Sequence, residues 1–301
     1  MYSRIYHQMS ENKSKKILIT GCSGLLGATA LSGFCEKYDV FGLYLNNPIK
    51  KNNVQTIRLD ITDERALSQV LQTIKPDLIY HTAALVNIDL CEIDKAGAFK
   101  TNVTATQTLA RYCAQNQAKF VFISTDAFFD GAKKQYYAEE DEPTPMNYYS
   151  ESKLLAEKAV CLICENHLII RTNIYGWNYQ NKQSFAEWIY YNLRDKNKIP
   201  LITDVYYTPI LTNTLLNCSL KLIASDLTGT YHVAGSERLS KYEFGRKLCK
   251  VFDFDPAYIE ETSVLSLKLK ARRSNNMALD TTKFRKRFPE EKLDVDADLR
   301  R

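Results

Sequence analysis

A glycine-rich turn between a short strand and a helix constrains the fold of this chain more than any other feature. Residues 15–20 form an apolar run typical of a buried strand, and Gly21, Gly24 and Gly27 follow it at three-residue intervals, before a helical pattern at 28–37. Gly21 can take a positive φ for a tight turn, Gly24 lets the backbone approach a pyrophosphate, and Gly27 permits close helix–strand packing. The helix N-terminus adds free amides and a positive dipole end. The pattern predicts a dinucleotide-binding loop.

Strands and helices alternate after this turn through about residue 175. Strands are predicted at 39–45, 55–59, 78–81, 120–124 and 167–171, and helices at 64–74, 95–117 and 149–164. Such alternation predicts an α/β fold with a parallel sheet covered on both faces, and right-handed crossovers make the sheet doubly wound. We therefore expect a flexible leader at 1–14, a Rossmann domain at 15–175, and a smaller, less regular C-terminal lobe at 176–301 that mainly binds substrate.

Composition excludes several other classes of protein. The net charge of +5 over 301 residues is mild, which favours a solvated basic surface over a nucleic-acid partner. No apolar run reaches the roughly 18 residues of a membrane span, and the leader lacks the apolar segment of a signal peptide. Cys161 and Cys164 form a C-x-x-C without a second pair or a nearby histidine, so buried reduced thiols are expected there rather than zinc. No metal is expected, and the location is predicted to be cytoplasmic.

The second chemical feature is a tyrosine and a lysine four residues apart, Tyr149 and Lys153. On a helix this spacing puts both side chains on one face. A nearby lysine favours the phenolate, which predicts a tyrosine pKa lowered from about 10 toward neutrality. Such a group can move a proton to or from a carbonyl oxygen. The run is common by chance, but here it follows a predicted strand that ends in the hydroxyls of Ser124 and Thr125.

The end of the second predicted strand bears on the choice of cofactor. A site for NAD usually carries an acid there to bind the ribose hydroxyls. Residues 44–47 contain no acid, and Lys50 and Lys51 follow, so the sequence leans slightly toward NADP(H) over NAD(H).

Two later strand ends complete the predicted cofactor site. Asp60 could accept a hydrogen bond from the adenine amino group, or serve only as a turn residue before the next helix. Ala83 and Ala84 are small enough to leave room for a cofactor across the sheet. His81 is expected to be a hydrogen-bonded structural histidine rather than a catalyst.

These motifs together resemble the extended short-chain dehydrogenases/reductases, and more narrowly the dTDP-4-dehydrorhamnose reductase family of sugar-nucleotide reductases. The narrower resemblance rests on S-T-D-A-F-F-D-G at 124–131, close to that family's S-T-D-Y-V-F-D-G. Further similar stretches are R-T-N-I-Y-G at 171–176, P-I-L-T at 209–212 and G-T-Y-H-V-A-G at 229–235. The likeness covers about residues 17–285.

The resemblance implies roles for individual residues. Tyr149 would protonate a keto oxygen as hydride arrives from the nicotinamide, Lys153 would hold the nicotinamide ribose, and Thr125 would hydrogen-bond the same oxygen. Asp126 and Arg273 are the expected substrate contacts. The expected cofactor contacts are Gly21, Ser23, Gly24, Leu25, Leu26, Gly27, Asn46, Asp60, Ile61, Ala83, Ala84, Asn102, Tyr149, Lys153 and Asn173.

The implied function is NAD(P)H-dependent reduction of a 4-keto-6-deoxy nucleotide sugar for a surface polysaccharide. Ala127 follows Asp126 where dehydratases of this superfamily carry a glutamate, and the cysteine of keto-sugar epimerase-reductases is absent near Thr125, so both activities are less favoured. Ser274 replaces the proline that often follows the family's arginine, here Arg273. A regulatory subunit resembling that of methionine adenosyltransferase stays open, as does the oligomeric state, with a homodimer as one candidate.

Overall fold

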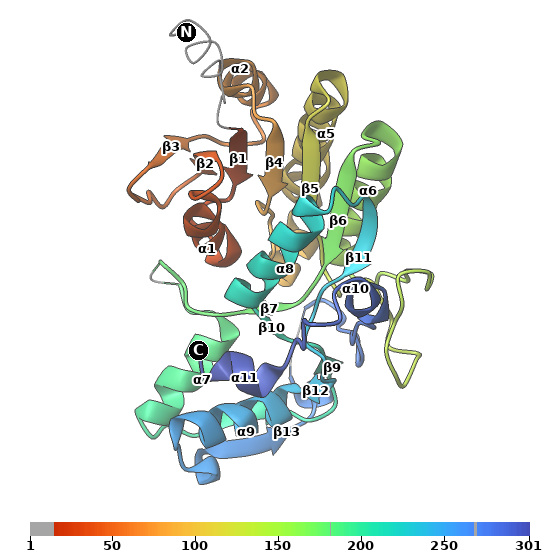
Figure 1. Cartoon of the computed structure of the whole chain (residues 1–301). Coiled ribbons are helices and arrows are strands. Elements are labelled where there is room, and N and C mark those ends of the chain that lie inside the picture. Colours follow the sequence, from red (N-terminus) through yellow and green to blue (C-terminus); the bar gives the residue numbers. More distant parts are fainter. Residues whose placement is uncertain (1–14, 181, 268–269) are drawn as a thin grey trace, which may run out of the picture.

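A sheet of seven parallel strands forms the centre of the protein (Figure 1). The computed structural model describes residues 15–180, 182–267 and 270–301, so the predicted leader at 1–14 lies outside the described residues. The strand order is β11-β6-β5-β4-β1-β2-β3, which confirms the predicted doubly wound α/β fold. The bounds are β1 Lys16–Thr20, β2 Asp39–Tyr44, β3 Val54–Arg58, β4 Leu78–His81, β5 Lys119–Ile123, β6 His167–Arg171 and β11 Gly229–His232.

Helices cover both faces of this sheet because its strands are apolar on both sides. Side chains alternate along a strand, so Ile17 and Ile19 join one buried cluster while Leu18 joins the other. The first cluster packs against α1 (Leu25–Phe34) and α8 (Thr212–Ala224). The second packs against α2 (Glu64–Ile74), α5 (Ala105–Asn116) and α6 (Tyr148–Ile163).

The helical segment predicted at 95–117 is not one regular helix. It begins as α4 (Lys95–Phe99), widens into a π-helical turn, η1 (Lys100–Thr104), and continues as α5. A short helix that was not predicted, α3 (Ile88–Ile93), precedes it. Single π turns inside helices are frequent at functional sites.

The C-terminal lobe packs around a core of its own. It lies below the sheet in Figure 1 and combines helices with two-stranded sheets. Its helices are α7 (Phe185–Arg194), α9 (Lys241–Phe252) and α11 (Val295–Leu299). Strand β8 (Ile199–Ile202) pairs with β13 (Ile259–Thr262), β9 (Tyr206–Tyr207) with β12 (Leu239–Ser240), and β7 (Ile174–Tyr175) with β10 (Ile210–Leu211).

The predicted domain boundary at residue 175 does not coincide with the end of the sheet. After entering the lower lobe, the chain returns to place α8 against α1 and β11 beside β6. Later still, α10 (Thr282–Arg287) adds Phe284 to the same buried cluster as α1. The C-terminal half therefore completes the sheet and its helical layer as well as forming the lower lobe.

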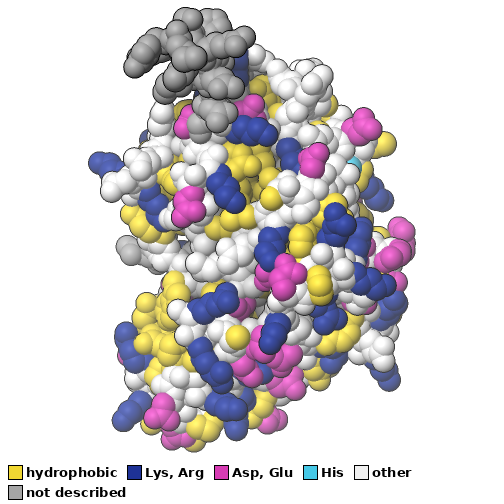
Figure 2. Space-filling view, viewed as in Figure 1, with side chains coloured by type: hydrophobic (Ala, Val, Ile, Leu, Met, Phe, Trp, Pro, Cys, Tyr) yellow, Lys and Arg dark blue, Asp and Glu magenta, His cyan; other side chains and the backbone are white. Residues whose placement is uncertain are grey.

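The strand order places a ligand site at one edge of the sheet. The chain proceeds outward from β1 through β2 to β3, then returns to β4 on the other side of β1. Ligands of doubly wound folds bind at the carboxyl ends of the strands beside such a reversal. Basic and acidic side chains are interspersed over the face shown in Figure 2. Within the described residues, no helix is both long enough and apolar enough to cross a membrane.

Candidate active site

The glycine turn after β1 has the conformation that a pyrophosphate-binding loop needs. Gly21 has a φ of +65°, and the Gly24 amide donates to the Gly21 carbonyl at 2.9 Å. A Cβ on Gly27 would collide with the Gly21 carbonyl oxygen and would lie 2.8 Å from the Cys22 Cα. Helix α1 therefore packs directly on the turn, and its N-terminus, where free amides can bind an anion, begins at the turn itself.

A cavity of about 820 Å³ runs from this turn along the strand ends to Phe185 at the start of α7. That size is typical of a small-molecule or cofactor site. Most of the predicted site residues line it: Gly21, Ser23, Gly24, Leu25, Leu26, Gly27, Asn46, Asp60, Ile61, Ala83, Ala84, Thr125, Asp126, Tyr149, Lys153 and Asn173.

Helix α6 places Tyr149 and Lys153 in the lining of the cavity. Its N-cap, Asn147, accepts a hydrogen bond from the Ser150 amide at 3.0 Å, which fixes the first turn. The buried Lys153 ammonium donates to the Ile123 carbonyl at 2.8 Å and lies 3.9 Å from the centre of the Phe122 ring. Both groups that hold it come from β5, so Lys153 is fixed directly against the strand end.

Burial changes the acidity of both side chains in the direction that favours their neutral forms. It raises the pKa of Tyr149 to about 12, although hydrogen bonding with Thr125 opposes the shift. It lowers the pKa of Lys153 to about 7. The predicted lowering of the Tyr149 pKa is therefore wrong in direction, because the Lys153 ammonium is directed at Ile123 and Phe122 and burial of the phenol dominates.

Thr125 and Asp126 follow β5 and are both buried. The Thr125 hydroxyl donates to the Asp126 carboxylate at 3.3 Å, and Asn173 Nδ2 donates to the same carboxylate at 2.7 Å. Burial raises the pKa of Asp126 to about 6, while the Asn173 hydrogen bond and the Lys241 charge oppose the increase. The end of β5 thus presents a hydroxyl and a carboxyl group with an elevated pKa.

Two further hydroxyls in the cavity wall have no partner among the described residues. Ser124 Oγ and Thr172 Oγ1 are buried, line the cavity and make no hydrogen bond there. Buried polar groups are nearly always hydrogen-bonded in native proteins, so these two fit the polar edge of a bound ligand. Together with the glycine turn, they fit a nicotinamide dinucleotide lying along the strand ends.

Asn102 and Arg273 do not line the cavity. From the π-helical turn, Asn102 Oδ1 accepts from the Leu85 amide at 2.8 Å and Nδ2 donates to Ser152 Oγ at 2.9 Å, so it ties the loop after β4 to α6. Arg273 Nη2 donates to Asp89 of α3 at 3.1 Å. Their cofactor and substrate roles stay predictions.

His81 and Asp60 make the hydrogen bonds of structural residues. His81 is fully buried between the hydroxyls of Thr20 and Thr106, at 2.6 and 2.9 Å, and burial lowers its pKa to about 3. Asp60 Oδ1 accepts from the amide and the hydroxyl of Thr62, although Asp60 also lines the cavity.

The segment that leads into α7 supplies cavity residues that the sequence did not indicate, including Lys182, and Phe185 follows as the first residue of the helix. Gln180 links two other lining residues, because its Nε2 contacts the Ser23 carbonyl and its Oε1 accepts from Asn47 at 2.8 Å. The only local signal was the capping box that starts α7, since Ser184 and Glu187 cap each other there.

The lysines behind the NADP preference lie outside the cavity lining. Lys51 Nζ donates to the Ala28 carbonyl of α1 at 3.1 Å, and Lys50 is exposed. The preference for NADP therefore cannot rest on these two residues.

One predicted thiol is not buried. Cys164 is buried, but Cys161 is exposed and its Sγ lies 3.7 Å from His167 Nε2. The expectation that no histidine lies near this pair is therefore wrong, because His167 closely follows Cys164 in the chain and contacts Cys161. Helix α6 turns position 161 toward solvent, which the apolar pattern around it did not indicate. The cysteines that the structure describes are free thiols.

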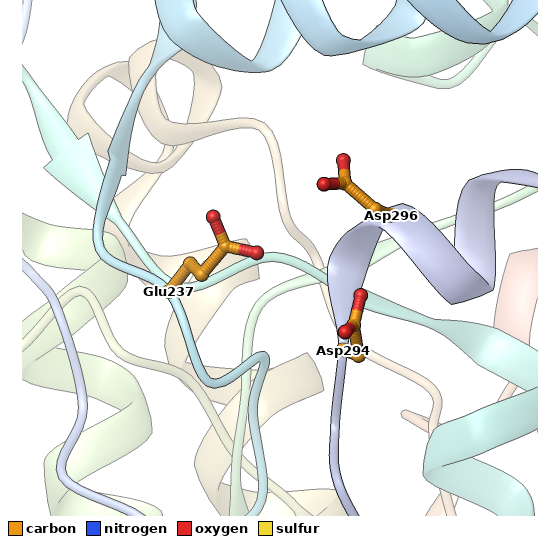
Figure 3. Close-up of side chains that lie close together, drawn as sticks. All are labelled: Glu237, Asp294 and Asp296. Atoms are coloured by element: carbon orange, nitrogen blue, oxygen red, sulfur yellow. The ribbon is translucent and has the colours of Figure 1, made fainter.

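Glu237, Asp294 and Asp296 gather near the start of α11 (Figure 3). Lys247 already bonds two of these carboxylates, Glu237 and Asp296, each at 2.9 Å. Asp294 caps α11 through the Ala297 amide. Lys247 thus offsets part of the negative charge of the three carboxylates, and the third carboxylate serves as a helix cap.

The fold and the Thr125–Tyr149–Lys153 arrangement define an extended short-chain dehydrogenase/reductase. Within this class, a family model described as the RmlD substrate binding domain matches residues 15–300. The chain belongs to this family, that of the dTDP-4-dehydrorhamnose reductases.

Individual relatives agree with this assignment. The chain is 31% identical over 268 residues to the probable low-salt glycan biosynthesis reductase Agl14 of Haloferax volcanii, covering 88% of this chain and 89% of that protein. A dTDP-4-dehydrorhamnose reductase from Bacillus anthracis, solved in complex with NADP, superposes with a TM-score of 0.80 at 26% identity, covering 91% and 93% of the two chains. Methionine adenosyltransferase 2 subunit beta of Xenopus laevis is 27% identical over 82% of this chain and 75% of that protein.

Proposed function

We propose that the protein is an NAD(P)H-dependent reductase that converts the keto group of a 4-keto-6-deoxy nucleotide sugar to a hydroxyl, for deoxysugar or polysaccharide biosynthesis. The observation that carries this proposal is the position of Thr125, Tyr149 and Lys153 in one cavity with the glycine turn. A reduction needs the cofactor loop and the proton donor to open on the same space, and this cavity supplies both.

Tyr149 is the proton donor in this scheme. Its pKa of about 12 keeps the hydroxyl protonated at neutral pH, so the proton is in place before the reaction. A reduced nicotinamide held by the cavity would supply the hydride for the keto carbon, and Tyr149 would give its proton to the keto oxygen. The phenolate that is left must then recover a proton from solvent.

Thr125 and Lys153 assist the same transfer. Negative charge builds on the keto oxygen as hydride arrives, and a hydroxyl fixed beside it stabilises that charge. Thr125 provides this hydroxyl from the end of β5. Lys153 is the proposed contact for the nicotinamide ribose, and its hydrogen bond to Ile123 holds it against the strand where the ring would lie.

We favour NADP(H) as the cofactor. The support is the NADP complex of the Bacillus anthracis relative, together with Lys100 and Lys182 in the cavity wall. Comparing Kd values for NADPH and NADH tests this preference. Equal affinities would remove it.

The proposed reaction is tested with NADPH and NADH against 4-keto-6-deoxy sugars linked to dTDP, UDP and GDP. Consumption of reduced cofactor that depends on one of these sugars, with the reduced sugar identified by mass spectrometry, is the expected result. If the cofactor binds and none of the sugars consumes it, the reductase proposal is overturned.

The likeness to methionine adenosyltransferase 2 subunit beta supports a second candidate, a nucleotide-binding regulatory subunit. This role predicts that the protein binds a methionine adenosyltransferase and changes its rate. Co-purification followed by a rate measurement distinguishes the two candidates.

A further inference from the structure

Lys241 is the first residue of α9, and its ammonium has no direct polar partner among the described residues. Its ammonium lies 3.2 Å from the centre of the Tyr207 ring and 5.0 Å from that of Phe185. No hydrogen bond or ion pair joins it to any residue in the described ranges. The carboxylate whose charge acts on it, that of Asp126, is hydrogen-bonded instead by Asn173 and Thr125.

Two electrostatic effects, burial and the dipole of helix α9, disfavour the positive charge of the Lys241 ammonium. The side chain is largely withdrawn from water, and burial lowers the pKa of Lys241 to about 8. The ammonium also stands at the N-terminus of a helix of 12 residues, where the dipole favours anions and disfavours cations. An anion bound beside Lys241 would offset both unfavourable effects.

The surroundings of Lys241 connect it to the cavity described above. Phe185 and Asp126, which lie near its ammonium, both line that cavity. Asp126 directly follows Thr125, which holds the keto oxygen in the proposed reaction. Lys241 does not itself line the cavity, but its side chain is partly exposed beside these two lining residues, on the side formed by the C-terminal lobe.

We propose that Lys241 is a substrate-binding residue whose ammonium takes a phosphate oxygen of a nucleoside diphosphate. This inference rests on the proposed function, because a nucleotide sugar carries its diphosphate on the same ring as the keto group. The ring and its diphosphate are then held from opposite sides, by β5 of the sheet and by α9 of the lobe. Lys241 thus makes the lobe part of substrate recognition.

Titration calorimetry with dTDP and UDP, on protein saturated with NADP⁺, tests this role. Lys241→Met should weaken the better-bound diphosphate by about 10-fold or more, as expected for loss of a charged hydrogen bond. Lys241→Arg should keep part of the affinity. Lys250→Met, which removes an exposed charge from the same helix, is the control and should bind like the unmodified protein.

Two further measurements separate phosphate binding from a structural effect. The Kd for NADP⁺ and the weak binding of thymidine and uridine should be the same with and without the Lys241 ammonium. The proposal is overturned if Lys241→Met binds diphosphates normally, if it weakens nucleosides and NADP⁺ equally, or if the unmodified protein binds neither diphosphate. Failure of every keto sugar to react, with the loss of diphosphate affinity still present, would count against the reductase alone.

Discussion

The Tyr149 hydroxyl is the group on which the proposed chemistry most depends. Burial keeps it protonated at neutral pH, and hydrogen bonding with Thr125 links it to the second hydroxyl of the site. The donor is therefore ready before the substrate arrives, and the step that needs assistance is the stabilisation of the phenolate afterwards.

Replacing Tyr149 with phenylalanine removes this proton and little else. We expect the rate of keto reduction to fall by about 10²- to 10⁴-fold, the usual contribution of a positioned acid. The Kd for NADPH should change by less than about twofold, since the ring stays in place. The neighbouring Tyr148→Phe is the matched control, and turnover close to normal in Tyr149→Phe would remove Tyr149 from the mechanism.

Asp126 makes the folding stability depend on pH. Its pKa rises from 3.8 to about 6 on folding, so between these values the folded protein binds more protons than the unfolded chain. This extra proton binding stabilises the folded protein. The stabilisation is fully present below pH 3.8 and is lost as the pH rises through 6. Asp126→Asn stays neutral throughout. The variant should therefore be more stable than the unmodified protein at pH 7, by up to about 3 kcal/mol, and equally stable near pH 4.

Urea unfolding of both proteins at the two pH values measures this difference. Asp39→Asn, at an exposed carboxylate, should give the same difference at both pH values. A constant difference for Asp126→Asn would contradict the raised pKa.

At the residue scale, the sequence predicted the residues of the site better than their environments. Most of the predicted site residues do line one cavity. They could be predicted because local sequence patterns show where the strands end, and the site lies at those ends. The pKa of Tyr149 could not be predicted, since it depends on burial beneath segments distant in sequence. Gln180 and Lys241 were missed for the same reason, because only the tertiary fold brings these two distant segments to the glycine turn and to the end of β5.

At the scale of single elements, helix α1 contains a matched pair of glycines. A Cβ at Gly27 would meet the Gly21 backbone, whereas one at Gly33 would meet only the side chain of Leu216, which can rotate. Alanine also favours a helix over glycine by about 1 kcal/mol. Gly27→Ala should therefore lose about 1–3 kcal/mol of stability and at least tenfold in NADPH affinity, while Gly33→Ala should change little.

Thermal unfolding and cofactor titration of the two variants check this prediction. The comparison is internal, since both changes add one methyl group to the same helix. Equal losses in the two variants would show that the close packing of Gly27 on the turn has no special importance.

The bounds of helices and strands could be predicted where a short apolar run lies between residues that interrupt regular structure, such as proline and aspartate. The bounds of β4, β6 and α2 match the predictions, and Pro76-Asp77 marks the turn before β4. The π-helical turn and α3 were not predicted, because tertiary contacts such as those of Asn102 select them. Helices α10 and α11 are too short for a periodic pattern to emerge.

At the scale of the whole molecule, the two halves of the sequence are not two independent units. Leu215, Leu216 and Leu222 of α8 cover the face of the sheet that α1 occupies, and β11 closes the edge at β6. A boundary at residue 175 was inferred from the loss of regular alternation, and sequence pattern alone could not reveal that the chain returns.

The fragment 15–175 should consequently fail to fold cooperatively. Without α8 the apolar side chains of α1 and of strands such as β6 would face water, and their burial is the main source of stability. Circular dichroism during urea unfolding should show a broad transition, and NADPH should not sharpen it. A cooperative transition with intact NADPH binding would show that the first half is self-sufficient.

The position of β11 also orders events during protein synthesis. Chains emerge from the ribosome N-terminus first, so β1 to β6 are available long before residues 229–232. Until then β6 presents an open strand edge, which can recruit strands of other nascent chains. Protection of this edge by chaperones during translation would therefore matter more for the yield of the protein than the speed with which the first six strands assemble.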